Sequence, residues 1–307
     1  MKKFIYKTIA FVLPFWLLLT VVDYLFSQVA KETNDYAFAI ESWHDVMNGD
    51  VEADVVVMGS SRALYHMNPV VMDSILGENT YNLGVDGRNL NTQINKYYIY
   101  RKRNKKPRLI IQNIDAFALK YEVGYNKYQF FPYFWDEDMR KAYFNEEPFT
   151  AGEKYLPMYR YIHRGLWVFL SNNEKHLVKG FRGQESSWNG SAFERIDSIP
   201  FVVSDTTSRR FDEYLSQVKA DGIKVVFVYS PIYIGATHKM TDQKRMYATY
   251  QHYADKYDIP ILDYTNMWLC YDTSYFYNAM HLNKQGADIF SDSLAHDIKR
   301  LGILNKP

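Results

Sequence analysis

Two short segments that lie far apart in the chain carry the residue types of a nucleophile and its base. Ser61 follows an apolar run at 55–58 and Gly59, and His281 precedes the last helical pattern of the chain. A serine hydroxyl becomes a nucleophile when a base within hydrogen-bond reach takes its proton, and histidine fills that role most often. Together the two segments predict acyl-transfer chemistry.

Each segment also fits a purely structural role. Ser60 and Ser61 are suited to cap the following helix or to bind a phosphate, and a histidine before a helix is frequently a surface residue. The neighbouring Arg62 and His66 could bind a substrate carboxylate or sugar hydroxyl, and Arg62 fits a salt bridge beneath the loop equally well. Catalysis is favoured because both segments fall at the same edge of one predicted sheet.

That sheet is predicted by apolar runs that alternate with amphipathic helix patterns. The run at 55–58 is continuous, which is typical of a strand buried on both faces. Further short strands are expected near 81–83, 109–111, 225–228 and 259–263. Alternating strands and helices predict a parallel sheet with helices on both faces, whose ligands bind at the carboxyl ends of the strands.

The N-terminus carries a membrane signal. Three lysines lie within residues 1–7, which we predict to be a cytoplasmic basic tail, and no charge follows until Asp23. Residues 8–26 are predicted to be an uncleaved signal anchor or transmembrane helix, and a cleaved signal peptide is the alternative. Because the lysines stay inside, both predictions place the rest of the chain on the extracytoplasmic, periplasmic face of the membrane.

The remainder of the chain divides unevenly. Residues 27–50 are expected to be a lead-in segment, and 51–307 a single α/β domain. Within that domain, 118–200 breaks the alternation with crowded aromatic residues, so we predict a large insertion there. It would form a lid or one wall of a cleft, or alternatively an ordinary packed subdomain.

Composition excludes several classes of function. The net charge of +1 gives no electrostatic footprint for nucleic acid. The single cysteine, Cys270, can form no internal disulfide and no cysteine-based zinc site. Histidines lack metal-ligand spacing and no phosphate-binding glycine-rich loop is present, so we expect neither a metal nor a cofactor.

The chain resembles the SGNH or GDSL-like hydrolase superfamily over roughly 51–300, in the form of its membrane-anchored extracytoplasmic branch. Gly59-Ser60-Ser61-Arg62 is similar to the first block, the segment 81–87 to the second, and the segment from His281 to Gly286 to the last. The resemblance implies a three-layer, flavodoxin-like α/β fold with about five parallel strands. It also implies that Ser61 is the nucleophile, that His281 is the base, and that the Gly87 amide, with Gly84 as second choice, helps form the oxyanion hole.

Two positions depart from the family pattern. Asn278 stands three residues before the histidine. At this position the family has an aspartate, which orients the imidazole and stabilises its positive charge in the transition state. An amide orients a histidine but adds no charge, so Asp263, Asp272 or a backbone carbonyl are alternative partners. The oxyanion-hole asparagine of the third block has no direct counterpart, and Asn113 is the candidate.

These features predict a membrane-anchored serine esterase that acts on O-acyl groups, O-acetyl first, of a glycan or another envelope ester. The substrate rests on the resemblance and on the abundance of aromatic residues. One alternative is an O-acyltransferase for an envelope polysaccharide, which would need an integral-membrane partner as acyl donor. Another, favoured by Asn278, is a catalytically weak or inactive binding protein. A carboxylate close to the distal nitrogen of His281 would favour the enzyme.

Overall fold

The computed structural model describes residues 1–307 except 35–38, 88, 121–125, 145–148, 164, 171–174, 191–197 and 305–307. Parts of the predicted lead-in segment and insertion therefore lie outside the described residues. The chain forms two compact units. One combines residues 1–44 with 123–175, and the other combines 45–122 with 176–307.

The larger unit is built on a five-stranded parallel sheet. Its strands are β1 (Val55–Met58), β2 (Thr80–Asn82), β3 (Leu109–Asn113), β4 (Lys224–Tyr229) and β5 (Ile261–Asp263). They lie in the order β2-β1-β3-β4-β5, and each neighbouring pair is parallel. This is the flavodoxin-like order, so the predicted fold class is confirmed. The order reverses between β1 and β3, and open α/β sheets bind ligands at such a switch point.

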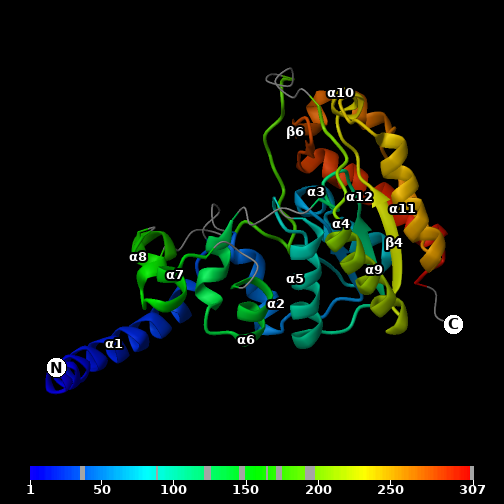
Figure 1. Ribbon diagram of the computed structural model, residues 1–307. Coiled ribbons are helices and arrows are strands. Elements are labelled where there is room, and N and C mark those ends of the chain that lie inside the picture. The colour runs from blue at the N-terminus through cyan, green and yellow to red at the C-terminus, as the bar shows by residue number, and fades with distance from the viewer. Residues whose placement is uncertain are drawn as a thin grey trace. The chain divides into compact units, whose positions relative to one another are not determined.

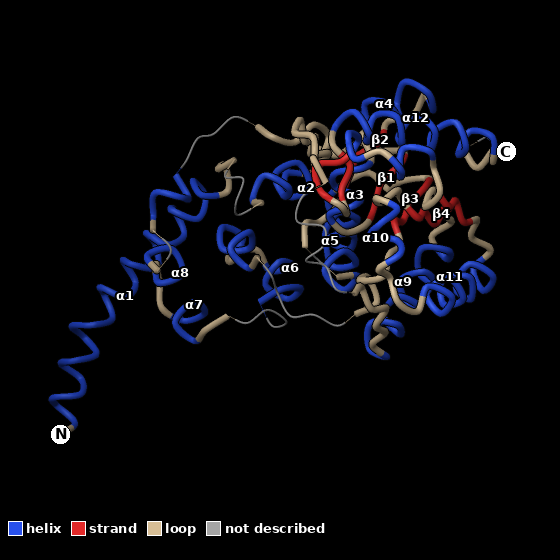
Figure 2. The backbone as a smooth tube through the Cα atoms, turned by 90° about the horizontal axis from the view of Figure 1, so that it is seen from above, coloured by secondary structure: helices blue, strands red, loops and turns tan. Residues whose placement is uncertain are grey.

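Helices cover both faces of this sheet, as Figure 2 shows for α4 and α12 on one side and α5, α9 and α11 on the other. Their bounds are α4 (Pro69–Leu76), α5 (Leu90–Arg103), α9 (Asp205–Ala220), α11 (Gln243–Tyr257) and α12 (Lys284–Arg300). Short elements complete this unit: α3 (Ser61–His66), α10 (Ile234–His238), β6 (Phe276–Asn278), β7 (His281–Leu282), and the 3₁₀ turns η6 (Trp268–Tyr271) and η7 (Thr273–Tyr275).

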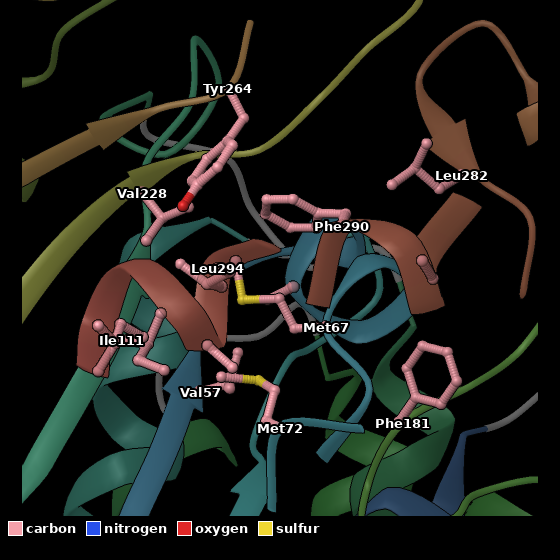
Figure 3. Packing of buried hydrophobic residues seen from close by; sticks show 14 of the residues in the cluster. Val57, Met67, Met72, Ile111, Phe181, Val228, Tyr264, Leu282, Phe290 and Leu294 are labelled. Carbon is pink, nitrogen blue, oxygen red and sulfur yellow. The ribbon is translucent and has the colours of Figure 1, made fainter. Parts of the chain in front are cut away.

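The core follows from the period-2 alternation of the strands. Val57, Ile111 and Val228 point to the face covered by α12, where Phe290 and Leu294 pack against them (Figure 3). The intervening strand residues point to the opposite face, where Phe227 of β4 contacts aromatic rings of α9 and α11. Both faces are therefore apolar, which explains the continuous apolar run of β1.

The smaller unit has an aromatic core of its own. Trp43 packs edge-on against Phe130 and Tyr143, and its indole N–H donates to the Gln129 side chain at 2.9 Å. Its elements are η1 (Ile40–Trp43), η2 (Lys127–Tyr133), α6 (Glu137–Met139), the π-turn η3 (Arg140–Phe144), α7 (Ala151–Tyr155), α8 (Tyr159–Ile162) and η4 (Leu166–Leu170). The helix α2 (His44–Asn48) follows η1 in the chain, and from Asp45 onward it belongs to the larger unit.

The N-terminal helix α1 (Lys2–Ala30) belongs to the smaller unit. In Figure 1 it is the labelled blue helix that begins at the N-terminus. Among the described residues, it is the one helix long and apolar enough to cross a membrane. Its large apolar residues before Asp23 are exposed, whereas Asp23, Ser27 and Ala30 are buried. The helix therefore has two parts. The part before Asp23 exposes apolar side chains, and the part from Asp23 to Ala30 packs into the smaller unit.

Candidate active site

The turn after β1 presents Ser61 at the carboxyl edge of the sheet. Gly59 has φ +155°, and a Cβ there would lie 2.7 Å from the Cβ of Ala63 and 2.8 Å from that of Asn113, so only glycine fits. The next residue, Ser60, is the N-cap of α3 and accepts from the Arg62 amide. Capping, the structural alternative for the two serines, thus falls to Ser60, and the hydroxyl of Ser61 is left for another partner.

That partner is His281, which a short hairpin carries to the same place. Strands β6 and β7 pair antiparallel, with Asn278 opposite His281. The Ser61 Oγ lies 2.8 Å from His281 Nε2, and His281 Nδ1 lies 3.0 Å from Asn278 Oδ1. The structure therefore brings the three predicted residues into one hydrogen-bonded series.

The hydrogen bonds define which nitrogen of His281 carries the proton. The Met280 amide donates to Asn278 Oδ1 at 2.9 Å, so this oxygen, and not the amide nitrogen, faces the imidazole. Nδ1 must then be the donor to Asn278, which leaves the lone pair of Nε2 directed at the Ser61 hydroxyl. This is the tautomer that a general base requires.

In the described part of the chain, no carboxylate bonds to His281. Asp272 accepts from the Ser274 amide at 2.9 Å, and Asp263 accepts from the amide and the hydroxyl of Thr265 at 2.9 and 2.6 Å. Both alternative partners named from the sequence are thus engaged elsewhere. Asn278 holds the position of the third member by itself.

The surroundings of His281 keep its imidazole neutral. Burial, together with the positive charge of Arg62, lowers the pKa of His281 from 6.5 to about 3. The ring stacks on Tyr277 at a centroid distance of 5.3 Å and meets the edge of Tyr65 at 5.4 Å. Because no adjacent carboxylate offsets these effects, the base is ready over the whole physiological range, but its protonated form is poorly stabilised.

A buried ionic network lies under the nucleophile turn. Asp115, 2% exposed, accepts from Ser60 Oγ at 2.8 Å and from the Phe117 amide at 2.8 Å, and its Oδ2 lies 3.6 Å from an Arg62 nitrogen. Arg62 also donates to the Ile114 carbonyl at 3.1 Å. The salt bridge beneath the loop, one of the two roles predicted for Arg62, is present. These contacts join the carboxyl end of β1 to the carboxyl end of β3.

His66 joins the nucleophile helix to the hairpin. It is fully buried, and its Nε2 accepts from the Leu282 amide at 3.2 Å. Burial and the nearby His281 keep the pKa of His66 well below 6.5, so it remains a neutral acceptor. His66 therefore sets the position of the residue next to His281, a role the sequence did not suggest.

The candidate oxyanion donors differ in their surroundings. The Gly84 amide donates to Asn82 Oδ1 at 2.8 Å and is thereby occupied. Gly87 lies in an exposed turn with φ +61°. Asn113, at the end of β3, is 1% exposed, and within the described residues neither its Nδ2 nor its Oδ1 has a hydrogen-bond partner. An unpartnered buried amide is costly, which marks Asn113 as a group with an unfilled role.

Asn82 is a positioning residue that sequence reasoning missed. Its Nδ2 donates to the carbonyls of Ala63 and Met67 at 2.7 and 2.8 Å, and its Oδ1 accepts from Gly84. One side chain thus binds the last turn and the C-cap of the nucleophile helix α3 and the start of the loop after β2. The only sequence signal was a polar residue between Tyr81 and Leu83 of a predicted strand.

Replacing Asn82 by alanine is expected to destabilise the larger unit by about 2–5 kcal/mol, because three buried hydrogen bonds to the backbone are lost, and among the described residues only the Ala63 carbonyl keeps another donor, the Met67 amide. Urea unfolding of the full chain in detergent, followed by circular dichroism, measures this. Gln251→Ala removes an exposed amide on α11 and serves as the control. Equal midpoints for the two variants would contradict the role of Asn82.

A flavodoxin-like parallel sheet with a hydrogen-bonded Ser–His–Asn series at its carboxyl edge defines the class: an α/β protein with the site architecture of a serine hydrolase. The chain is similar to solved structures of proteins described as lipolytic or GDSL-like. No family model and no curated protein matches it.

Solved structures of three proteins illustrate the likeness. One is described as a lipolytic protein of the G-D-S-L family from Desulfitobacterium hafniense DCB-2, 11% identical, with a TM-score of 0.43 over 79% of this chain and 97% of that one. A second is described as an acylhydrolase from Bacteroides fragilis NCTC 9343, 12% identical, with a TM-score of 0.41 over 87% and 97%. A third is a GDSL-like lipase from Bacteroides thetaiotaomicron VPI-5482, 13% identical, with a TM-score of 0.40 over 87% and 98%.

Proposed function

We propose that this protein is a serine esterase of the SGNH type. The observation that carries the proposal is the 2.8 Å contact between Ser61 Oγ and a nitrogen of His281 that the Asn278 bond leaves unprotonated. Nucleophile, base and orienting group then have the mutual geometry that acyl transfer requires. The names of the neighbouring structures, lipase and acylhydrolase, agree with this chemistry.

The reaction follows from the order of the hydrogen bonds. Ser61 Oγ attacks the ester carbonyl while its proton passes to His281 Nε2, and Asn278 holds the Nδ1–H. The oxyanion is stabilised by the backbone amides of Ser61 and Gly87 and by the Asn113 side chain. The tetrahedral intermediate expels the alcohol, which takes the proton back from Nε2. Water, activated by the same nitrogen, then hydrolyses the acyl-enzyme.

The substrate in this proposal is an O-acyl group, O-acetyl first, on a glycan or another envelope ester. The site would lie on the extracytoplasmic face, because the lysines of the N-terminal tail favour the cytoplasm. If an alcohol rather than water reaches the acyl-enzyme, the same residues perform O-acyl transfer, and the acyl group would come from an integral-membrane partner. If Asn278 supports too little catalysis, the fold serves as a binding protein.

The test is hydrolysis of a chromogenic acetyl ester by the full chain in detergent, followed by release of acetate from an O-acetylated glycan. Turnover of both supports the esterase. Transfer of the acetyl group to an added sugar, without net release of acetate, supports the transferase instead. No covalent modification of Ser61 by a fluorophosphonate and no turnover would overturn the proposal in both forms.

The pH dependence is a separate prediction. Because the pKa of His281 is lowered to about 3, the base stays neutral in mild acid, and kcat/KM is expected to hold through pH 5–6, where a histidine of ordinary pKa would already be protonated. Asn278→Asp places a carboxylate beside Nδ1, raises the pKa of His281 and moves the acid limb to higher pH. Initial rates from pH 4 to 8 measure both.

The control for this experiment is the stability of the fold at each pH. His66 and His281 are held neutral in the folded state, so below pH 6.5 the unfolded chain binds more protons and stability falls as the pH falls. Circular dichroism at each pH separates this loss from loss of the base. A wild-type acid limb centred near pH 6.5, with the fold intact, would contradict the prediction.

A further inference from the structure

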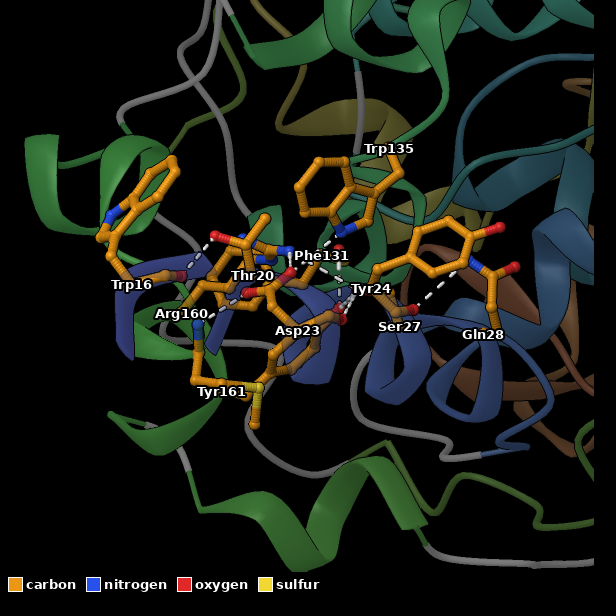
Figure 4. Close-up of polar contacts among 11 residues, drawn as sticks. Trp16, Thr20, Asp23, Tyr24, Ser27, Gln28, Phe131, Trp135, Arg160 and Tyr161 are labelled. Carbon is orange, nitrogen blue, oxygen red and sulfur yellow. Dashed lines mark hydrogen bonds and ion pairs between the residues drawn. The ribbon is translucent and has the colours of Figure 1, made fainter. Parts of the chain in front are cut away.

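The packed end of helix α1 holds one particular segment of the smaller unit. The Asp23 carboxylate, fully buried, forms an ion pair with Arg160 and accepts from the Met158 amide at 2.6 Å and from the Trp135 indole at 2.9 Å (Figure 4). One turn later, the hydroxyls of Ser27 and Tyr161 lie 2.8 Å apart. The segment 155–162 is thereby fixed against the helix at the level of Asp23.

The same segment turns apolar side chains outward. Tyr155 is 72% exposed, Leu156 52%, Tyr159 41% and Ile162 62%. We call these four residues the interfacial patch. Among them lie the Met158 amide, the Arg160 guanidinium and the Tyr161 hydroxyl, which bond to α1, so the helix contact itself orients the patch away from the smaller unit's core. Exposed aliphatic and aromatic side chains gathered on one segment mark an interaction surface.

The length of the exposed apolar part of α1 indicates the depth at which the patch would lie in a bilayer. From Phe4 to Val22 the helix spans about 28 Å at 1.5 Å per residue, close to the roughly 30 Å of a hydrocarbon core. Asp23, the first charge after this stretch, then lies at the outer boundary of the core. Because Asp23 bonds directly to residues 158 and 160, the patch lies at the same depth.

We propose that the interfacial patch sits in the headgroup region of the bilayer that α1 spans. Tyrosines are enriched at this depth because one end of the ring is apolar and the other is hydrated, and Leu156 and Ile162 suit the acyl boundary. The apolar surface of the helix continues into the patch, so a lipid surface is the occupant that fits both. In this proposal the smaller unit rests on the bilayer surface, and α1 stays attached to it as part of the folded unit. This proposal does not depend on the esterase activity.

The test is the depth of fluorescent labels on the full chain in phosphatidylglycerol vesicles. Cys270, the only cysteine, is buried and is first replaced by alanine. Single cysteines then replace Leu156 or Ile162 and carry an environment-sensitive dye. The matched control is Val70→Cys on α4, since Val70 is 50% exposed and Leu156 52%.

We expect blue-shifted emission at 156 and 162 and quenching of both by lipids brominated near the headgroup, with neither effect at 70. Labels at 156 and 162 that behave like the one at 70 would overturn the proposal. Blue-shifted emission without lipid quenching would also overturn it, because the patch would then be covered by protein. The use of two exposed positions guards against misfolding of either variant.

Discussion

Ser61→Ala and His281→Gln are each expected to reduce kcat/KM for an acetyl ester by about 10⁴–10⁶-fold, the largest effects of any single change on activity. Ser61 supplies the nucleophilic oxygen, and His281 supplies the nitrogen 2.8 Å away that takes its proton. The double variant should lose no more than either single variant, because the two groups act as one unit. Initial rates with a chromogenic ester measure all three.

Matched controls exist on the same fold. Ser74→Ala removes an exposed hydroxyl of α4, and His296→Gln removes an exposed imidazole of α12. Both are expected to retain wild-type rates. If Ser61→Ala retained activity while the controls did too, another residue would be the nucleophile, and the hydrogen-bonded series at the sheet edge would have no catalytic role.

Arg160→Met is expected to lower the stability of the smaller unit by about 3–5 kcal/mol, because Asp23 is left as a buried, unpaired charge. The double variant Asp23→Leu with Arg160→Met should recover much of this loss, since no uncompensated charge remains. Thermal unfolding of the full chain in detergent, followed by tryptophan fluorescence, measures both effects.

An exposed ion pair in the same unit provides the control. Glu137 and Lys141 are four residues apart and both largely exposed, so Lys141→Met should give no measurable change. If Arg160→Met were as mild as Lys141→Met, the ion pair of Asp23 with Arg160 would contribute little to stability, and α1 would be less firmly held than the hydrogen bonds indicate.

The sheet was predictable from the sequence because each strand carries its own local signal. The run Val55–Met58 is apolar without interruption since helices cover both faces of β1, and the strand order then follows the flavodoxin-like pattern. Ser61 and His281 were predictable for a similar reason. Each comes directly after or before an element whose end is visible in the sequence.

Other parts of the site have no local signal. Asn82, Asp115 and His66 act through hydrogen bonds to residues that only the folded sheet edge brings close, and each is also an ordinary residue type for a core or a loop. The pairing of Asp23 with Arg160 joins positions 137 residues apart. In the sequence alone, Asp23 was therefore only the first charge after the apolar run.

The hairpin β6–β7 gives the site a mechanical property. Asn278 and His281 are cross-strand partners on one short hairpin, whereas Ser61 belongs to the sheet edge and α3. The base and the amide that orients it therefore belong to one hairpin, which His66 ties to α3 through the Leu282 amide. A substitution in this hairpin that displaced it would therefore move the base and its orienting amide away from Ser61 together.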